Sequence, residues 1–158
     1  MTKTTYVVAG NGASLAHPFE GRILGSDFML RTNNFFFEPQ SFLGPRVDLA
    51  VMGGDPRVAP FMFETLWQCR KTYDLRQWTS HNPSVVSAGQ RRFGPQYRPL
   101  SFGPPAIARQ VQALIAKYDR KPMTGTYALL AACSLHMAAP PETRGAIILV
   151  GMDLYSTD

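Results

Sequence analysis

The sequence predicts an α/β fold, a Rossmann-like and mostly parallel sheet with helices on both faces. Three observations support this prediction. Four short apolar segments each run into glycine, asparagine or aspartate, as strands do where they enter a turn. Segments with apolar residues at helical spacing lie among them. The last apolar segment, 146–150, is continuous and follows a helical segment, as expected for a fully buried strand in a parallel sheet covered on both faces.

The amino-terminal half supplies three predicted strands and one helix. Residues 5–9 are apolar and β-branched or aromatic until glycine ends the run, and residues 28–32 and 47–52 form similar runs. Residues 58–73 carry apolar side chains at helical spacing and predict an amphipathic helix. The three strands therefore end in loops of similar character.

The carboxyl-terminal half mixes an irregular segment with two helices. Prolines and glycines recur through 79–105, which predicts a long irregular surface segment with only a hint of a short strand at 85–86. A helix is expected over 105–121, with proline ahead of its first turn. A second helix is expected over 124–137, with Thr124 as its cap.

Size and composition narrow the class of protein. At 158 residues the chain fits a single domain, 1–158. No apolar run approaches the roughly 18 residues of a membrane span, and the amino terminus lacks a signal peptide, so a cytoplasmic protein is expected. The net charge of +5 favours an anionic ligand, but the basic residues are scattered, so nucleic acid is not expected. The two cysteines lack metal-ligand spacing and are expected to be reduced thiols.

The tight loop 10–12, Gly-Asn-Gly, is the first candidate site. It is not a dinucleotide fingerprint, because Leu15 stands where the third glycine would be, and no P-loop lysine follows. One interpretation is a plain strand-ending turn. The other is a ligand site, because Asn11, Asn33 and Asp153 all follow strand ends, which parallel strands bring to one edge. Glycines there would let backbone N–H groups approach a phosphate or ribose closely.

Five short motifs, in one order along residues 7–155, resemble a known family. They are AGNGASL, RTNNFFFE, LGPRVDLAV, TGTYALLAACSL and ILVGMDLY. Together they resemble the bacterial sialyltransferases of glycosyltransferase family 42, the Campylobacter-type lipooligosaccharide sialyltransferases. The resemblance implies a GT-A-variant nucleotide-binding domain. It further implies an enzyme that transfers sialic acid from CMP-sialic acid to a galactoside or sialoside acceptor of lipooligosaccharide or capsule, with inversion.

The resemblance also implies the site residues. Those matching donor-binding positions are Gly10, Asn11, Gly12, Ser14, Asn33, Asn34, Thr124, Gly125, Gly151 and Asp153. Thr124 and Gly125 match a helix start that faces the nucleotide, where a helix N-terminus favours negative charge. Tyr155 is the implied catalytic residue, whose hydroxyl would hydrogen-bond the phosphate as CMP leaves. No metal or cofactor is implied, because hydroxyl donors and a helix dipole can serve a monophosphate leaving group.

The chain departs from the family pattern at its carboxyl end. The family's general-base histidine and a second phosphate-binding tyrosine would follow Asp158, so we expect a truncated chain without the C-terminal lid. None of the three histidines is expected to replace that base. His17 and His81 are expected to be exposed, and His136 to meet the carbonyls of a helix's last turn.

Two positions and three functions stay open at this stage. After the third strand, either Gly53 or Asp55 takes the place of a family asparagine, and Lys121 is either a site residue or an ordinary surface lysine. The chain is an active sialyltransferase, a CMP-binding but inactive homologue, or a related glycosyltransferase with another donor. Peripheral contact with the inner face of the bacterial inner membrane and homo-oligomer formation are further expectations.

Overall fold

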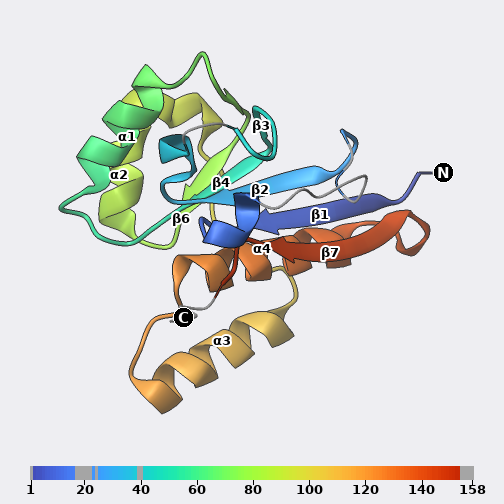
Figure 1. Ribbon diagram of the computed structural model, residues 1–158. Coiled ribbons are helices and arrows are strands. Elements are labelled where there is room, and N and C mark those ends of the chain that lie inside the picture. Colours follow the sequence, from blue (N-terminus) through green and yellow to red (C-terminus); the bar gives the residue numbers. More distant parts are fainter. Residues whose placement is uncertain (1, 17–22, 24, 39–40, 154–158) are drawn as a thin grey trace.

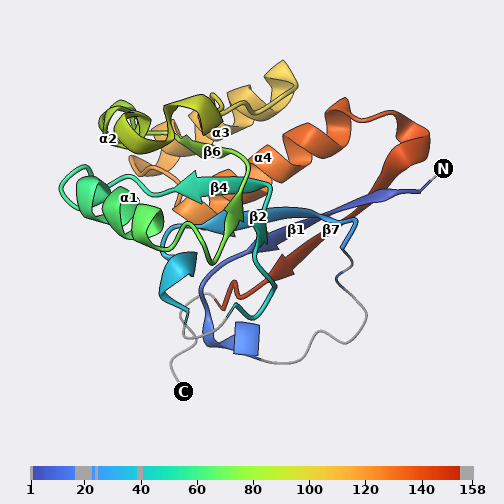
Figure 2. The same cartoon turned by 90° about the horizontal axis from the view of Figure 1, so that it is seen from above.

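A five-stranded sheet forms the centre of the computed structural model, which describes residues 2–16, 23, 25–38 and 41–153. The strands are β1 (Thr4–Ala9), β2 (Phe28–Thr32), β4 (Leu49–Met52), β6 (Trp78–Ser80) and β7 (Arg144–Val150). They lie in the order β6-β4-β2-β1-β7, and every neighbouring pair is parallel. Helices lie on both faces of the sheet (Figure 1; Figure 2), which confirms the predicted α/β fold class.

One face of the sheet is covered by α4 (Thr124–Ala138). The buried side of this helix is mostly alanine with Tyr127, and it packs on Tyr6, Val8 and Leu30. Small side chains let the helix lie close to the strands, while Val8 and Leu30 stand opposite one another in the β1–β2 register. Because α4 returns the chain to the start of parallel strand β7, its first residues lie at the carboxyl edge of the sheet.

The other face is covered by α1 (Ala59–Gln68) and α2 (Pro83–Phe93), which pack on β4 and β6. Trp78 is fully buried between them, with its ring centroid 4.8 Å from that of Phe63. Its indole N–H donates to the Phe93 carbonyl over 2.6 Å. This burial makes Trp78 the anchor that fixes the edge strand β6 under the two helices.

The prediction of an irregular segment over 79–105 is wrong for the first half of that range. The hint of a strand at 85–86 is also wrong, because these residues lie in a helix. Residues of this segment complete β6 and then form α2, which is capped by Asn82. Gly89 gave part of the loop signal, yet it lies inside α2. A Cβ at Gly89 would lie 2.4 Å from the rings of Phe63 and Trp78, so the glycine serves close packing.

The predicted strand 47–52 is interrupted at Asp48. The residues before it form β3 (Arg46–Val47), which pairs in parallel with β5 (Asp74–Leu75) in a separate two-stranded sheet. The Asp48 carboxylate accepts the Met29 N–H over 2.7 Å and pairs with Arg46 and Arg76 over 2.8 and 3.1 Å. These bonds stabilise a buried charge and explain why a polar residue stands in an apolar run.

Two element boundaries and the burial of one strand also differ from the predictions. The helix expected over 58–73 ends at Gln68. The cap position of α4 is Met123, so the prediction that Thr124 caps this helix is wrong. Strand β7 is not fully buried, because it is an edge strand on which Leu149 is 49% exposed. Its continuous apolar sequence therefore does not mean that both of its faces are covered.

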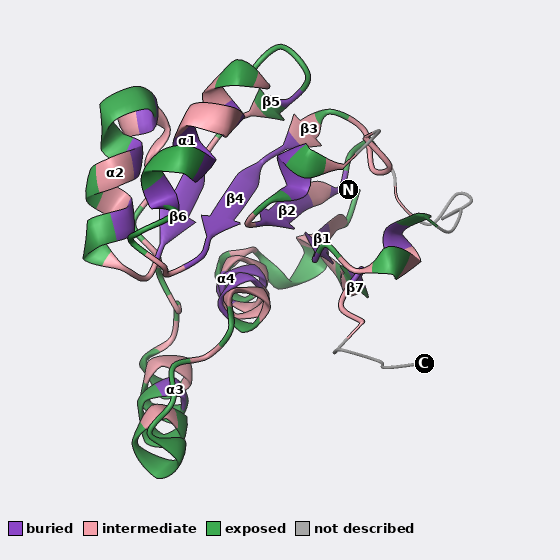
Figure 3. Cartoon of the chain, turned by 60° about the vertical axis from the view of Figure 1, so that its left-hand side comes forward, coloured by how far each residue is buried: buried purple, intermediate pink, exposed green. Residues whose placement is uncertain are grey.

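Helix α3 (Pro105–Tyr118) stands apart from the rest of the molecule (Figure 3), and Val111 is its one buried residue. Its side chains Leu114 and Tyr118 are more than half exposed. Among the helices of the described residues, none is long and apolar enough to cross a membrane.

Candidate functional site

The candidate site lies at the carboxyl edge of the sheet, where loops leave all five strands. Open parallel sheets bind their ligands at this edge, because the loops that follow the strands meet there. The structure brings the loop after β1 against both the end of β7 and the end of β2. The predicted convergence of Asn11, Asn33 and Asp153 on one edge is therefore present in the fold.

Glycine is required at positions 10 and 12 by the close approach of the last strand. The Gly10 N–H donates to the Val150 carbonyl over 2.9 Å. The Gly12 N–H donates to the Gly151 carbonyl over the same distance. A Cβ built on Gly10 would lie 2.2 Å from the Gly151 oxygen, and one on Gly12 would lie 2.3 Å from the Asp153 carboxylate. These two N–H groups are engaged within the protein rather than directed at a ligand.

Asp153 ties the same loop to the end of β7. One carboxylate oxygen accepts the Ser14 N–H over 2.9 Å, and the other accepts the Ser14 hydroxyl. Gly151 has a φ of +61°, and a Cβ there would lie 2.7 Å from the Leu15 side chain. These bonds hold the first loop against the end of β7.

Asn33, Gly53 and Thr124 meet at the centre of this edge. Asn33 has a φ of +46°, a left-handed conformation that asparagine adopts more readily than most residues. Its side-chain oxygen is buried and accepts no hydrogen bond within the described part of the chain. A Cβ on Gly53 would lie 2.4 Å from that oxygen and 3.1 Å from the Thr124 hydroxyl. An unpaired buried acceptor costs about 1–3 kcal/mol, which a ligand N–H or O–H would recover.

Two hydrogen bonds hold the loops around this group together. The Asn11 side-chain N–H donates to the Thr32 carbonyl over 3.0 Å, which joins the first loop to the end of β2. The Asn33 backbone N–H donates to the Val51 carbonyl over 3.1 Å, which joins the second loop to β4. Asn34 is exposed, so the structure brings Asn11 and Asn33 together and leaves Asn34 at the surface.

The start of α4 closes one side of the edge. Among the described residues no side chain caps this helix, and the N–H groups of its first turn point along the helix axis, an arrangement that favours an anion. Gly125 lies against Met152, whose sulfur would be 3.1 Å from a Cβ at that position. A mainly apolar hollow of about 420 Å³ lies between the helix start and the end of β7, lined in part by Ser14, Gly125, Gly151 and Asp153.

His81 lies at the same edge of the sheet, at a position that the sequence reasoning did not expect. It follows β6, and it is half-buried rather than exposed. Its ring stacks on Tyr127 of α4, with centroids 4.2 Å apart and 14° between the planes. Gly54 permits this position, because a Cβ there would lie 2.8 Å from the imidazole. Burial, and then the positive charge of Lys121, lower the pKa of His81 below its ordinary 6.5, which favours the neutral ring.

The remaining predicted residues lie elsewhere. Tyr155 and His17 are outside the described residues. Asp55 forms an exposed ion pair with Arg57 over 2.8 Å, whereas Gly53 is the residue that lies beside Asn33 and Thr124.

His136 does not meet its own helix's last carbonyls. Its Nε2 lies 3.1 Å from the Gly145 carbonyl oxygen of β7. Cys69 and Cys133 are free and half-buried. Within the described ranges, no three histidine, cysteine, aspartate or glutamate side chains are grouped as ligands for a metal ion.

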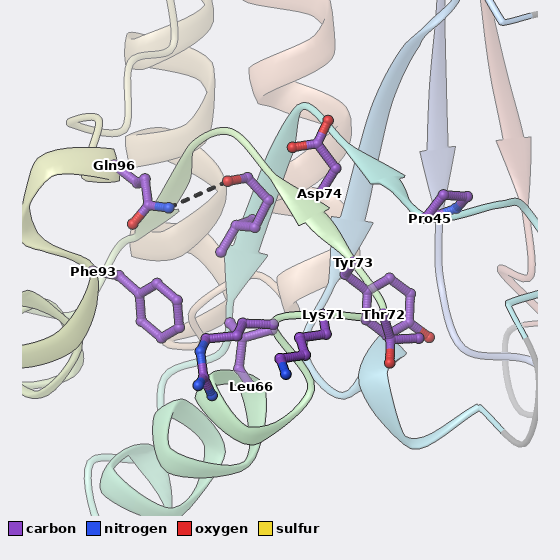
Figure 4. A pocket seen from close by; sticks show the side chains of 10 residues that line it. Pro45, Leu66, Lys71, Thr72, Tyr73, Asp74, Phe93 and Gln96 are labelled. Carbon is purple, nitrogen blue, oxygen red and sulfur yellow. Dashed lines mark hydrogen bonds between the residues drawn. The ribbon is translucent and has the colours of Figure 1, made fainter.

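A second cavity, of about 440 Å³, lies at the opposite edge of the sheet, between the end of α1 and β5 (Figure 4). Its lining includes Arg70, Lys71, Tyr73 and Asp74, and none of the predicted site residues. Strands β3 and β5 precede β4 and β6, so this cavity lies at the amino edge. Because Arg70 and Lys71 line it, this cavity is the alternative to the carboxyl edge as a site for an anionic ligand.

Comparisons with known proteins find solved structures of similar fold. No family model and no curated protein matches the chain. The apo α-2,3-sialyltransferase from Campylobacter jejuni superposes with a TM-score of 0.72 over 98% of this chain, at 18% identity. The C. jejuni sialyltransferase CstII with the substrate analogue CMP-3FNeuAc gives 0.69 over 96%, at 19% identity. The monofunctional α-2,3-sialyltransferase Cst-I from C. jejuni gives 0.72 over 99%, also at 19% identity.

The sheet defines the fold class of the chain. A parallel sheet with helices on both faces is an α/β fold. More particularly, it is the fold of these C. jejuni sialyltransferases. The chain spans 62%, 65% and 58% of the length of the three solved chains, in the order given.

Proposed function

We propose that this chain is the donor-binding part of a sialyltransferase and that it binds the CMP portion of CMP-sialic acid at the carboxyl edge. The observation that carries the proposal is the meeting of Asn33, Gly53 and Thr124, where a buried amide oxygen has no partner among the described residues. Structures of the same fold support the choice of ligand, since CstII was solved with CMP and with CMP-3FNeuAc.

The chemistry of the donor fits the groups present. The leaving group of CMP-sialic acid is a nucleoside monophosphate, so less charge develops on it than on a diphosphate. We expect the uncapped start of α4, with the Thr124 hydroxyl, to stabilise that charge through N–H and O–H donors. Tyr155, outside the described residues, is proposed to donate a further hydrogen bond to the departing phosphate. The reaction would transfer sialic acid with inversion and without a metal.

The proposal for the acceptor rests on the family resemblance and not on the residues at the carboxyl edge. We propose a galactoside or sialoside terminus of lipooligosaccharide or capsule, at the inner face of the bacterial inner membrane. The structure of CstII with a trisaccharide acceptor and CMP supports a glycan acceptor for proteins of this fold. The net charge of +5 would favour approach to an anionic membrane surface.

The proposal is tested by melting the protein with and without CMP, with CDP, UMP and AMP as controls. A ligand at about 100 times its Kd adds roughly 2.7 kcal/mol to the free energy of unfolding, which raises the Tm of a chain of this size by roughly 5–10 °C. We expect CMP to give this shift and the other three nucleotides to give less. Equal shifts with every nucleotide would contradict a CMP-specific site, and no shift on a folded sample would contradict the function.

A matched pair of variants locates the effect. Asn33→Gly keeps the left-handed backbone and removes the amide, so CMP affinity should fall about tenfold while the Tm without ligand changes little. Asn34→Gly changes the exposed neighbour and should leave CMP affinity within about twofold. The reverse ranking of the two variants would place the ligand away from the Asn33 amide.

A further inference from the structure

We propose that the buried ion pair between Arg31 and Glu38 is a positioning device, which holds the loop that presents Asn33 to the ligand. Arg31 lies in β2, and Glu38 follows the single-turn helix η2 (Phe35–Phe37). The pair thus closes the short segment that contains Asn33. This role rests on the proposed CMP-binding function. In it, Arg31 and Glu38 support the Asn33 loop and do not contact the ligand themselves.

The pair is deeply buried and incompletely hydrogen-bonded. The Arg31 side chain is 0% exposed and that of Glu38 is 9% exposed. The Arg31 Nη2 pairs with the Glu38 carboxylate, while Nε and Nη1 have no hydrogen-bond partner in the described part of the chain. Burial lowers the pKa of Arg31 and raises that of Glu38, and the attraction between the two charges opposes both shifts. The charge of Arg31 therefore depends on Glu38 for its compensation.

Stability alone does not explain such a pair. Apolar residues of similar volume often replace a buried ion pair with no loss of stability, because both charges must be desolvated to form it. Here the surroundings are already apolar and aromatic. The Arg31 guanidinium lies 5.4 Å from the centroid of the Phe35 ring, and Phe35 packs edge-on against Tyr73 at 5.0 Å. A role in fixing the geometry of the loop explains why a buried ion pair stands in these apolar surroundings.

The geometry in question is that of the Asn33 loop. Asn33 adopts a left-handed conformation, which is unfavourable for a residue with a side chain and persists only where the surroundings fix it. The ion pair ties the residue two positions before Asn33 to the residue five positions after it. The Thr32 carbonyl, which accepts the Asn11 side chain, lies in the same segment. Displacing this segment would move both asparagines together.

The test compares two variants in the full chain. Glu38→Gln removes one charge and leaves Arg31 uncompensated, so both stability and CMP affinity should fall. Arg31→Met combined with Glu38→Leu removes both charges, so stability should return to the level of the wild type or above it. CMP affinity in the double variant should stay about tenfold weaker than in the wild type. Val85→Ala, a change at a fully buried position in α2, is the control that lowers stability without weakening CMP binding.

Calorimetric titration with CMP and NMR of the Asn33 side-chain amide supply the readouts. We expect the double variant to keep its Tm, bind CMP more weakly and shift the Asn33 NH₂ resonances even without ligand. A double variant that binds CMP like the wild type, with unchanged Asn33 resonances, would overturn the inference. If the wild type itself does not bind CMP, the proposed function fails, while the resonances of ligand-free protein still decide whether the ion pair positions Asn33.

Discussion

Gly12 and Asn33 have different tasks in the crevice, although sequence reasoning put both in the same class of donor-binding residue. The Gly12 N–H bonds to the end of β7, and its missing side chain makes room for the Asp153 carboxylate. The Asn33 side chain instead presents a buried oxygen that no described residue satisfies. At the residue scale, one position therefore joins two strands, and the other is available to recognise a ligand.

Replacing Gly12 with alanine should lower the free energy of unfolding by about 1–3 kcal/mol, because the new Cβ would lie 2.3 Å from the Asp153 carboxylate. Urea denaturation measures this change. Gly94→Ala is the matched control, since a Cβ at Gly94 meets nothing within 4 Å and its backbone is helical, with a φ of −54°. That variant should be neutral or slightly stabilised. Equal effects at the two positions would contradict the contact between the first loop and β7.

His81 should titrate below its ordinary pKa of 6.5, because burial and then Lys121 disfavour the charged ring. A histidine with a lowered folded pKa contributes stability that is fully present above pH 6.5 and is lost as the pH falls through the folded pKa. NMR titration of the ring protons measures this value directly. Lys121→Met should raise the pKa of His81 by removing the smaller of the two causes. A value at or above 6.5 in the unchanged protein would contradict the half-buried position against Tyr127.

At the scale of elements, the strands and the asparagines that follow them could be predicted, and the β6–α2 unit could not. Residues 28–32 have a clear β pattern, and β2 has these bounds. Strand β6 is only three residues long, and the Gly89 in the next helix serves contacts with Phe63 and Trp78. Those contacts join residues distant in sequence, so local composition indicated a loop. The Asn-Pro-Ser sequence at 82–84 was the signal available, since it is typical of a helix start.

Asn82 is expected to stabilise the fold in two ways, as the cap of α2 and through a hydrogen bond to the loop after β4. Its side-chain oxygen accepts the Ser84 N–H over 2.9 Å, and its side-chain N–H donates to the Gly54 carbonyl over 2.6 Å. Asn82→Ala should lower the free energy of unfolding by about 1–2 kcal/mol, measured by urea denaturation. Asn82→Asp keeps the acceptor and loses the donor, so its loss should be smaller. If the aspartate variant lost as much as the alanine variant, the helix cap would not be the larger contribution.

At the scale of the whole molecule, the two edges of the sheet offer different sites. The carboxyl edge gathers Asn11, Asn33 and Thr124, whereas the amino edge holds the cavity with Arg70 and Lys71. The sequence pattern predicted the first edge, because polar residues follow predicted strand ends. It gave no indication of the second, which forms where the end of α1 meets β5, and such a meeting depends on tertiary packing.

The central claim is that CMP binds at the carboxyl edge, and mapping its binding by amide chemical shifts in NMR tests this most directly. The account predicts that CMP perturbs the backbone amides at 11, 33, 53 and 124–126 together with the Asn33 side-chain amide, while the amides of Tyr73 and Gln96 stay unchanged. Perturbations confined to residues around Tyr73, Asp74 and Gln96 would place the nucleotide in the cavity at the amino edge and contradict the account.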